Sequence, residues 1–229
     1  MKMIDGIKFV AFDLDGTLLD SVPDLADAVN KTLQALGRPE VTIAQMTTWI
    51  GNGAEIMLGR ALSRSIEVDP DLDPALHREA RQLFDRFYDE GGHRQSALYP
   101  GVKDTLDALR DAGIPMAIVT NKPAQFLPHL LAQHGIADYF VDVIGGDTFP
   151  QKKPDPFALH WLMEKHRLAA RELLMVGDSR NDILAAQAAT CYVVGLTYGY
   201  NYGQPISASD PDIVLDHFSQ LAEVVKLGS

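Results

Sequence analysis

The feature that most constrains this chain is an apolar segment that runs straight into two aspartates. Residues 7–12 form the apolar run, and Asp13, Asp15, Gly16 and Thr17 follow it closely. An apolar run of this length predicts a strand buried on both faces of a parallel sheet. Two carboxylates at the end of such a strand lose hydration, which is costly unless a cation pairs with them. The segment therefore indicates a divalent-cation site, and a carboxylate that is free to attack could also act as a nucleophile.

The hydrophobic spacing changes after this first strand. Between residues 20 and 92 apolar side chains recur at helical spacing only, and from residue 102 onwards helical and strand-like segments alternate. Helices are expected at about 23–36, 42–49, 53–63, 74–90, 102–112, 123–134, 154–166, 180–189 and 216–227, and strands at 115–119, 139–144, 173–176 and 191–196. The alternation predicts an α/β fold, a doubly wound parallel sheet of residues 1–19 and 95–229, with an all-helical insertion at 20–94. The junctions near residues 20 and 93–100 are candidate hinges.

The acidic composition excludes some classes of partner. The formal net charge is −11, so the surface repels nucleic acid and anionic lipid, and we expect neither as a partner. No stretch of about 18 apolar residues occurs, so we expect no membrane-spanning helix. Residues 1–6 lack the apolar core of a secretory signal. The single cysteine, Cys191, fits a reducing compartment, which we take to be the cytoplasm.

Polar side chains also follow other expected strands. Thr120 and Asn121 come after one of them, Asp178 comes after another, and Lys153 lies at an expected helix start. Ligands in open α/β sheets bind at the carboxyl ends of the strands, so we expect these side chains to meet the two aspartates. Carboxylates with water suit Mg²⁺. A hydroxyl, an amide and an ammonium suit the oxygens of a phosphoryl group, which an acidic protein could bind only with such local positive charge.

The order of these segments carries a resemblance to a known family. Asp13–Thr17, Thr120, Lys153 and Gly177–Asp182 resemble the four motifs of the haloacid dehalogenase-like phosphatase superfamily, in the order of that family and over nearly the whole chain. The resemblance implies a Mg²⁺-dependent hydrolysis of a small anionic phosphomonoester through an aspartyl-phosphate. It also implies that residues 20–94 are the mobile helical cap domain of the family, inserted after the first motif.

Roles for the central residues follow from the same resemblance. Asp13 is expected to be the nucleophile and a metal ligand. Asp15 is expected to be the general acid and base, with its backbone carbonyl on the metal. Asp178 would supply the remaining metal carboxylate. Thr120 and Asn121 would bind phosphate oxygens through the hydroxyl and backbone N–H groups.

Several neighbours are expected to support this site. Lys153, directly before a proline, would neutralise the phosphoryl group and hold Asp13, whereas Lys152 is expected to be solvated. Gly16 would let the chain turn near the substrate, and Thr17 would brace the loop. Asp182 would bind the metal through water or orient Lys153, although an acid in a first helical turn also suits the helix dipole. Lys122 lies beside the site in the sequence, and we expect it at the surface, with a functional role as the alternative.

A narrower resemblance concerns the substrate. Four segments resemble bacterial phosphoglycolate phosphatases, a family within the superfamily, and imply 2-phosphoglycolate as substrate: Trp49–Ala54, Val119–Pro123, Gly177–Asp182 and Tyr198–Asn201. Gly53 precedes a helix whose free N–H groups could bind a carboxylate. Arg60 lies on an apolar helix, an unusual place for a charge, and would contact that carboxylate or pair with an acid of the cap.

Other functions stay open at this point. The enzyme could act on another small phosphomonoester or on pyrophosphate, or it could be a β-phosphoglucomutase-like phosphomutase. Such mutases usually carry Glu-Asp where this chain has Gly177-Asp178, which favours hydrolysis. A dehalogenase would lack Asp15, a phosphonatase would need a cap lysine better placed than Lys31, and a non-catalytic binding protein would not need all four motifs. The oligomeric state, monomer or homodimer, is left open.

Overall fold

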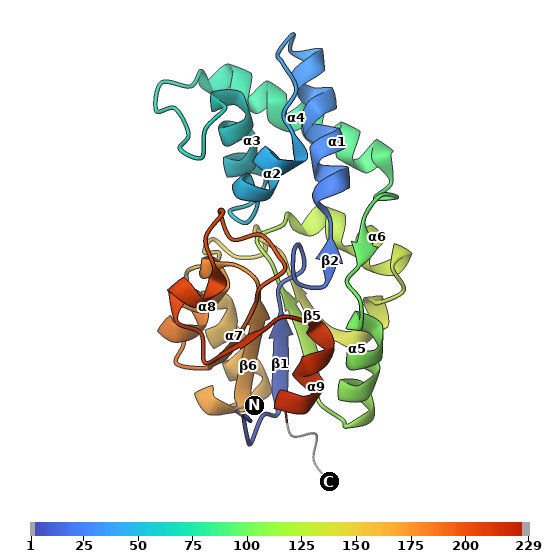
Figure 1. Cartoon of the computed structure of the whole chain (residues 1–229), viewed down its shortest axis with the longest axis vertical. Helices are drawn as coiled ribbons and strands as arrows, with labels where there is room; N and C mark the ends of the chain where they lie inside the picture. Colours follow the sequence, from blue (N-terminus) through green and yellow to red (C-terminus); the bar gives the residue numbers. More distant parts are fainter. Residues whose placement is uncertain (1–2, 226–229) are drawn as a thin grey trace.

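A six-stranded parallel sheet forms the centre of the protein (Figure 1). The structure, a computed structural model, describes residues 3–225. The strand order is β5-β4-β1-β6-β7-β8. The strands are β1 Phe9–Phe12, β4 Met116–Val119, β5 Phe140–Ile144, β6 Leu173–Gly177, β7 Tyr192–Leu196 and β8 Ile213–Leu215. The prediction of a doubly wound parallel sheet is therefore confirmed.

Alternating side chains of the strands supply two separate apolar cores. Along β1, Val10 and Phe12 face one core and Phe9 and Ala11 face the other, and all four are buried. Helices α5 (Val102–Asp111), α6 (Leu127–Gln133) and α9 (Leu221–Val224) cover the first face, and α7 (Phe157–His166) and α8 (Arg180–Ala188) cover the second. Short 3₁₀ helices lie at Ala124–Phe126, Ala137–Tyr139, Ala170–Glu172, Ile206–Ser209 and Phe218–Gln220. A strand buried on both faces explains the apolar run that precedes Asp13.

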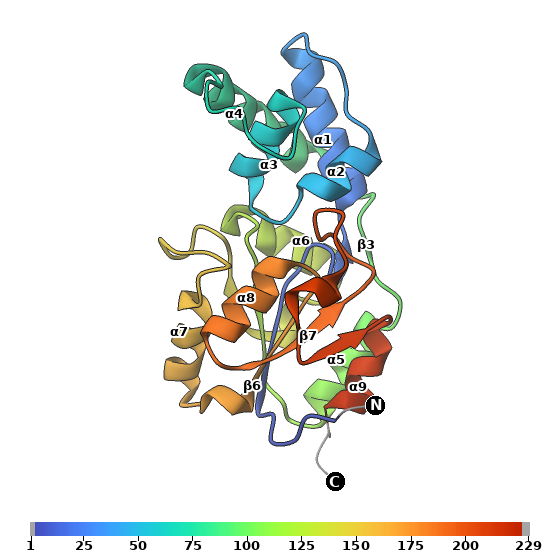
Figure 2. The same ribbon diagram turned by 60° about the vertical axis from the view of Figure 1, so that its left-hand side comes forward.

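Four helices form a separate group beyond the carboxyl ends of the strands, here called the helical unit (Figures 1 and 2). They are α1 Val22–Ala35, α2 Ile43–Trp49, α3 Ala54–Ser63 and α4 Pro74–Gly91. The unit has its own apolar core, in which Leu25, Val29 and Leu33 of α1 pack with Phe84 and Tyr88 of α4. Its helices therefore bury their apolar faces against one another, mostly independently of the sheet.

A two-stranded antiparallel ribbon joins the helical unit to the sheet. Strand β2 (Leu19–Asp20) leads out and β3 (Ala97–Leu98) leads back, with Leu19 paired to Leu98. Next to the ribbon, the carboxylate of Asp24 accepts hydrogen bonds from the backbone N–H groups of Gln95, at 3.1 Å, and Ser96, at 2.6 Å. The two crossings of the chain are thus tied together where the sequence analysis expected hinges.

Several elements differ from the sequence prediction, among them the unpredicted ribbon strands β2 and β3. The helix expected from 154 begins at Phe157, because residues 152–155 form a turn in which the N–H of Asp155 donates to Lys152 O. Strand β8 was not predicted, since only its two end residues are buried. The helix expected at 216–227 is reduced to a 3₁₀ turn and the short α9 up to residue 224, and its last two positions lie outside the described residues. Within residues 3–225 no helix combines the length and apolarity needed to cross a bilayer.

Candidate active site

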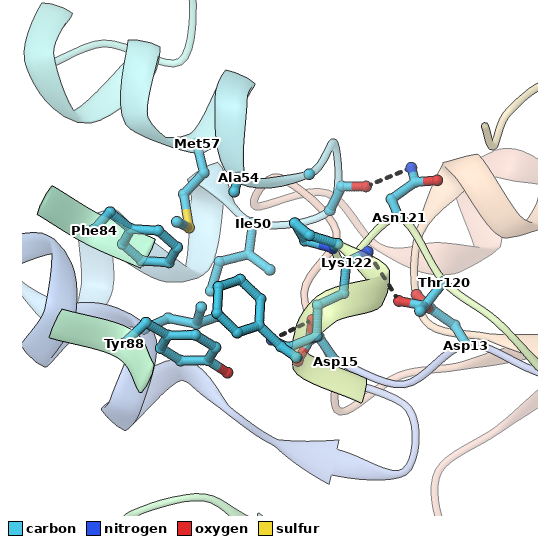
Figure 3. A pocket seen from close by; sticks show the side chains of 15 residues that line it. Asp13, Asp15, Ile50, Ala54, Met57, Phe84, Tyr88, Thr120, Asn121 and Lys122 are labelled. Atoms are coloured by element: carbon cyan, nitrogen blue, oxygen red, sulfur yellow. Dashed lines mark hydrogen bonds and ion pairs between the residues drawn. The ribbon is translucent and has the colours of Figure 1, made fainter. Parts of the chain in front are cut away.

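A cleft lies between the carboxyl end of the sheet and the helical unit (Figure 3). Strand β1 stands between β4 and β6, so chain connections diverge to either side of it, the arrangement that opens a ligand crevice in α/β sheets. The cleft has a volume of about 470 Å³ counted to its open mouth. Its lining comprises Asp13, Asp15, Thr120, Asn121, Lys122, Pro123 and Phe126 from the core and Leu25, Ile50, Gly51, Gly53, Ala54, Met57, Phe84 and Tyr88 from the helical unit.

Asp13 lies at the floor of this cleft, directly after β1. Its N–H donates to Val176 O at 3.0 Å, which extends the sheet ladder to the site. Its carboxylate accepts from the N–H of Leu14 at 2.8 Å and lies 3.0 Å from the ammonium of Lys153. Burial raises the pKa of Asp13 to about 6, although the positive charge of Lys153 opposes this rise. A carboxylate here is therefore costly to ionise and suited to a cation.

Lys153 is the buried cation that the sequence analysis placed beside Asp13. Its Nζ lies 2.6 Å from Asp182 Oδ1, and the other oxygen of Asp182 accepts from the N–H of Ser179 at 3.0 Å and from its hydroxyl. Burial lowers the pKa of Lys153, but the carboxylates of Asp13 and Asp182 raise it more. Asp182 thus orients Lys153 while it also closes the first turn of α8. Lys152 is exposed, as expected.

Three buried carboxylates form a cluster that could hold a metal ion. Single oxygens of Asp13, Asp178 and Asp182 lie within 4.8 Å of one another. Burial, together with the charges of Asp13 and Asp182, raises the pKa of Asp178 well above its usual value. Hard carboxylate oxygens crowded in this way fit a divalent cation such as Mg²⁺, whose charge would relieve the repulsion.

The backbone around the cluster leaves no room for larger residues. Gly16 has a φ of +87°, and a Cβ added there would lie 2.1 Å from Asp178 Oδ2. The hydroxyl of Thr17 donates to the other oxygen of Asp178 at 2.7 Å, and the N–H of Tyr200 donates to Oδ2 at 2.5 Å. Gly16 therefore permits the close approach of two loops, and Thr17 braces Asp178 instead of facing the cleft.

Thr120 and Asn121 follow β4, as predicted, but their side chains make different contacts. Thr120 lines the cleft, and its hydroxyl oxygen accepts from the N–H of Lys122 at 3.2 Å. The amide of Asn121 donates to Lys153 O at 2.8 Å and to Gly51 O at 2.9 Å. The Asn121 side chain therefore ties the loop of the helical unit to the loop of Lys153.

Lys122 is buried, and the expectation of a surface position is wrong. It is 5% exposed. Its Nζ lies 3.1 and 3.2 Å from the two carboxylate oxygens of Asp15 and 4.7 Å from the centre of the Tyr88 ring. The ring of Tyr88, which lies against the ammonium, belongs to α4 and is distant in the sequence. Figure 3 shows Lys122 and Asp15 joined at the cleft.

The two residues expected to select the substrate lie in different places. Gly53 begins α3 at the cleft. Arg60 is buried within the helical unit and does not line the cleft. Its guanidinium donates to Trp49 O at 2.9 Å and to Ile66 O at 2.8 Å. Arg60 therefore holds the backbone around α2 and α3, at a position outside the lining of the cleft.

The segment after β7 contains contacts that the role assignments missed. Tyr200 donates its hydroxyl to Asp20 at 2.5 Å and accepts from the N–H of Val22 at 3.2 Å. The amide of Asn181 donates to the hydroxyl of Tyr202 at 2.8 Å and to Gly51 O at 3.0 Å. These contacts connect the core with the helical unit. Residues 198–201 were singled out by resemblance, so the sequence held a signal for this segment.

Comparisons with known proteins agree with this geometry. The family model described as haloacid dehalogenase-like hydrolase matches residues 10–196. A phosphoglycolate phosphatase of Photobacterium profundum is 79% identical over 99% of both chains. A phosphoglycolate phosphatase of Vibrio vulnificus (strain YJ016) is 61% identical over 96% of both. The crystal structure of a predicted phosphoglycolate phosphatase from Haemophilus somnus 129pt, 40% identical, superposes with a TM-score of 0.90 over 96% of this chain and 98% of that one.

Proposed function

The chain belongs to the haloacid dehalogenase-like hydrolases, and from this membership we propose that it is a Mg²⁺-dependent phosphatase that converts 2-phosphoglycolate to glycolate and phosphate. The observation that carries the proposal is the position of Asp13, held by Lys153 at the floor of a cleft and next to a buried acidic cluster. The near full-length identity to named phosphoglycolate phosphatases supports the choice of substrate.

The residues of the cleft can bind and transfer a phosphoryl group. The ammonium of Lys153 and the hydroxyl of Thr120 would neutralise and orient phosphate oxygens, and the N–H of Asn121 would add a donor. Asp13 would attack phosphorus while the bond to the glycolate oxygen breaks, which leaves an aspartyl-phosphate. Mg²⁺ would be held by Asp13, Asp178 and the carbonyl of Asp15, and when bound it supplies positive charge beside the transferred group.

Asp15 would act as the general acid in the first step and as the general base in the second. It lines the cleft two residues after Asp13, on the same loop. It would first protonate the leaving glycolate oxygen and then take a proton from the water that attacks the aspartyl-phosphate. The second attack releases phosphate and regenerates Asp13. The loop after β1 thus carries both the proposed nucleophile, Asp13, and the proposed proton-transfer group, Asp15.

The helical unit would act as the cap of this site. We take residues 20–94 as a cap domain over a core of residues 1–19 and 95–229, and the separate apolar core of the unit supports this division. The apolar side chains of Met57 and Phe84 would exclude water from the phosphoryl group. Cys191, buried and without a disulfide, is compatible with work in the cytoplasm.

One structural observation argues against the phosphomutase alternative. A Cβ added at Gly177 would lie 2.2 Å from Cγ of Asp182. A glutamate at this position, as mutases of the β-phosphoglucomutase type carry, would displace the residue that orients Lys153. Hydrolysis is therefore the reaction that this arrangement favours.

A substrate panel tests the proposal. We expect kcat/KM for 2-phosphoglycolate, measured with Mg²⁺, to exceed that for other small phosphomonoesters and for pyrophosphate. A flat profile would reduce the function to a general phosphatase, and a preference for another ester would replace the substrate. Release of inorganic phosphate is the readout, with a no-enzyme control for each ester.

A further inference from the structure

The cleft contains one cationic side chain and one unpaired hydroxyl that the roles above do not use. We propose that Lys122 and Tyr88 bind the second anionic group of the substrate, the carboxylate that lies beyond the transferred phosphoryl group. The inference rests on the proposed function and deepens it, because it names the residues that distinguish a phosphorylated hydroxy acid from other phosphomonoesters.

Charge at the cleft singles out Lys122. Among the described residues that line it, Lys122 is the one with a cationic side chain, since neither Lys153 nor Arg60 is part of the lining. The lining also contains two carboxylates, those of Asp13 and Asp15. A substrate with two anionic groups would be repelled by these unless a cation faced the group that is not transferred. Lys122 is the residue in position to do so.

The position of Lys122 matches this role. It comes two residues after Thr120, on the loop proposed to bind phosphate, and its ammonium lies between Asp15 and the ring of Tyr88. An ammonium has three hydrogens to donate. Asp15 accepts from it on one side, so a substrate carboxylate could share the same ammonium.

Tyr88 gives an independent indication of a ligand. The residue is 1% exposed and lines the cleft, and among residues 3–225 its hydroxyl has no partner within 3.5 Å in hydrogen-bonding geometry. Leaving a buried hydroxyl unpaired costs free energy, so the arrangement suits an acceptor brought by a ligand. Figure 3 shows Tyr88 and Lys122 among the side chains around the cleft.

The apolar side chains of the cleft limit the size and polarity of the part of the substrate that bears the carboxylate. Leu25, Ile50, Met57, Phe84 and Phe126 surround the polar pair. A short acid would place its carboxylate at Lys122 and Tyr88, and a long polar chain would have to bury hydroxyl groups against these side chains without partners. These apolar side chains therefore favour a short phosphorylated acid over a sugar phosphate.

Two substrates that differ only in the carboxylate test the assignment. In ethyl phosphate a methyl group replaces the carboxylate of 2-phosphoglycolate, and the measured quantity is the ratio of kcat/KM for the two substrates. We expect Lys122→Gln to lower this ratio by about 10–100-fold, as for loss of a charged hydrogen bond. Tyr88→Phe should lower it by about 3–10-fold, because one neutral donor is lost. Lys122→Arg should restore part of the ratio.

Lys103→Gln is the matched control, since it removes an exposed lysine of α5 that does not line the cleft, and it should leave the ratio unchanged. Thermal unfolding of each variant shows whether it folds. If Lys122→Gln does not fold, Tyr88→Phe, which deletes a single oxygen, decides the question.

The outcomes separate this inference from the proposed function. If the wild type prefers 2-phosphoglycolate but both variants keep the wild-type ratio, the proposed function stands and the carboxylate assignment is overturned. Equal losses on both substrates would assign Lys122 to positioning Asp15, which also overturns it. If the wild type shows no preference for 2-phosphoglycolate, the proposed function fails, and this inference fails with it.

Discussion

Lys153 Nζ lies 2.6 Å from a carboxylate oxygen of Asp182, and both side chains are buried. This ion pair joins the loop after β5 to the first turn of α8. Because the same ammonium lies 3.0 Å from Asp13, the pair fixes the position of the cation relative to the proposed nucleophile. A buried charge that is held from two sides has little freedom to move when a substrate binds.

Replacing Asp182 tests this positioning role. Asp182→Asn keeps the shape of the side chain but removes the negative charge that holds Lys153. We expect kcat to fall about 10–100-fold, because small misplacements of catalytic groups are costly. The fall should be equal for 2-phosphoglycolate and ethyl phosphate, since Lys153 would act on the phosphoryl group common to both. An unchanged kcat would contradict the role.

Asp13→Asn tests the covalent scheme. The amide cannot form an aspartyl-phosphate, so we expect kcat to fall by about a thousandfold or more. The variant has to be purified free of host phosphatase, which a mock purification from cells without the gene checks. Activity close to that of the wild type would show that the proposed nucleophile is wrong.

Metal binding should be visible in stability as well as in activity. Mg²⁺ that binds only the folded protein raises the unfolding temperature, and we expect this rise for the wild type measured by differential scanning fluorimetry. Asp178→Asn should abolish the rise because it removes a carboxylate of the cluster. A chelator should stop hydrolysis, and added Mg²⁺ should restore it. A full Mg²⁺-dependent rise in the Asp178 variant would place the ion elsewhere.

Arg60 should matter for stability and not for the choice of substrate. Arg60→Ala leaves the carbonyls of Trp49 and Ile66 without their charged donor. We expect the free energy of unfolding in urea to fall by about 2–3 kcal/mol, with no change in the substrate ratio defined above. Arg78→Ala, at an exposed position of α4, is the control and should cost far less. If Arg60→Ala changes the substrate ratio but not the free energy of unfolding, Arg60 would have to be assigned to substrate binding.

His93 gives the folded protein a specific dependence on pH. It is buried between α4 and β3, edge-on to Tyr88 at 4.4 Å, and burial, followed by the charge of Lys122, lowers its pKa to about 4. The unfolded chain takes up this proton near pH 6.5. The stability contribution is therefore full above pH 6.5 and is lost as pH falls towards 4, by about 2 kcal/mol at pH 5.

The variant His93→Asn isolates this effect. Asparagine tolerates the positive φ of 53° at this position. Urea unfolding at pH 7.5 and pH 5.0 gives the loss for each protein, and the loss should be smaller in the variant by the amount contributed by His93. Equal losses in both proteins would mean that the imidazole titrates normally in the folded state.

The sequence was sufficient for the central part of the site. Asp13, Thr120 and Asp178 follow strands that are buried on both faces, and the parallel order of these strands brings their ends to one edge. That inference needs only hydrophobic patterning and the rule that ligands bind at strand ends. Asp182 also lies in the first turn of α8, where an acid suits the helix dipole, and it accepts from the N–H and the hydroxyl of Ser179.

The errors concern contacts between segments that are distant in the sequence. Lys122 was expected at the surface because nothing near it in the chain shows that the ring of Tyr88 lies against it. For Arg60 the sequence left a substrate carboxylate and an acid of the cap as possible partners, because the carbonyl of Trp49 that binds it comes within reach only when α2 and α3 pack. The hydrophobic pattern predicts which face of a helix is buried. It does not predict which polar groups inside the core are available to bind a buried charged side chain.

The ribbon of β2 and β3 has a consequence for how such a protein can change over evolution. Leu19 and Leu98 are paired, so the chain leaves the core and returns to it at adjacent points. The intervening segment can be lengthened, shortened or exchanged as a module while the register of the six parallel strands is preserved. The residues proposed for phosphoryl transfer belong to the core, outside the segment between β2 and β3. Most of the apolar residues that would select the substrate belong to that segment and could change with it.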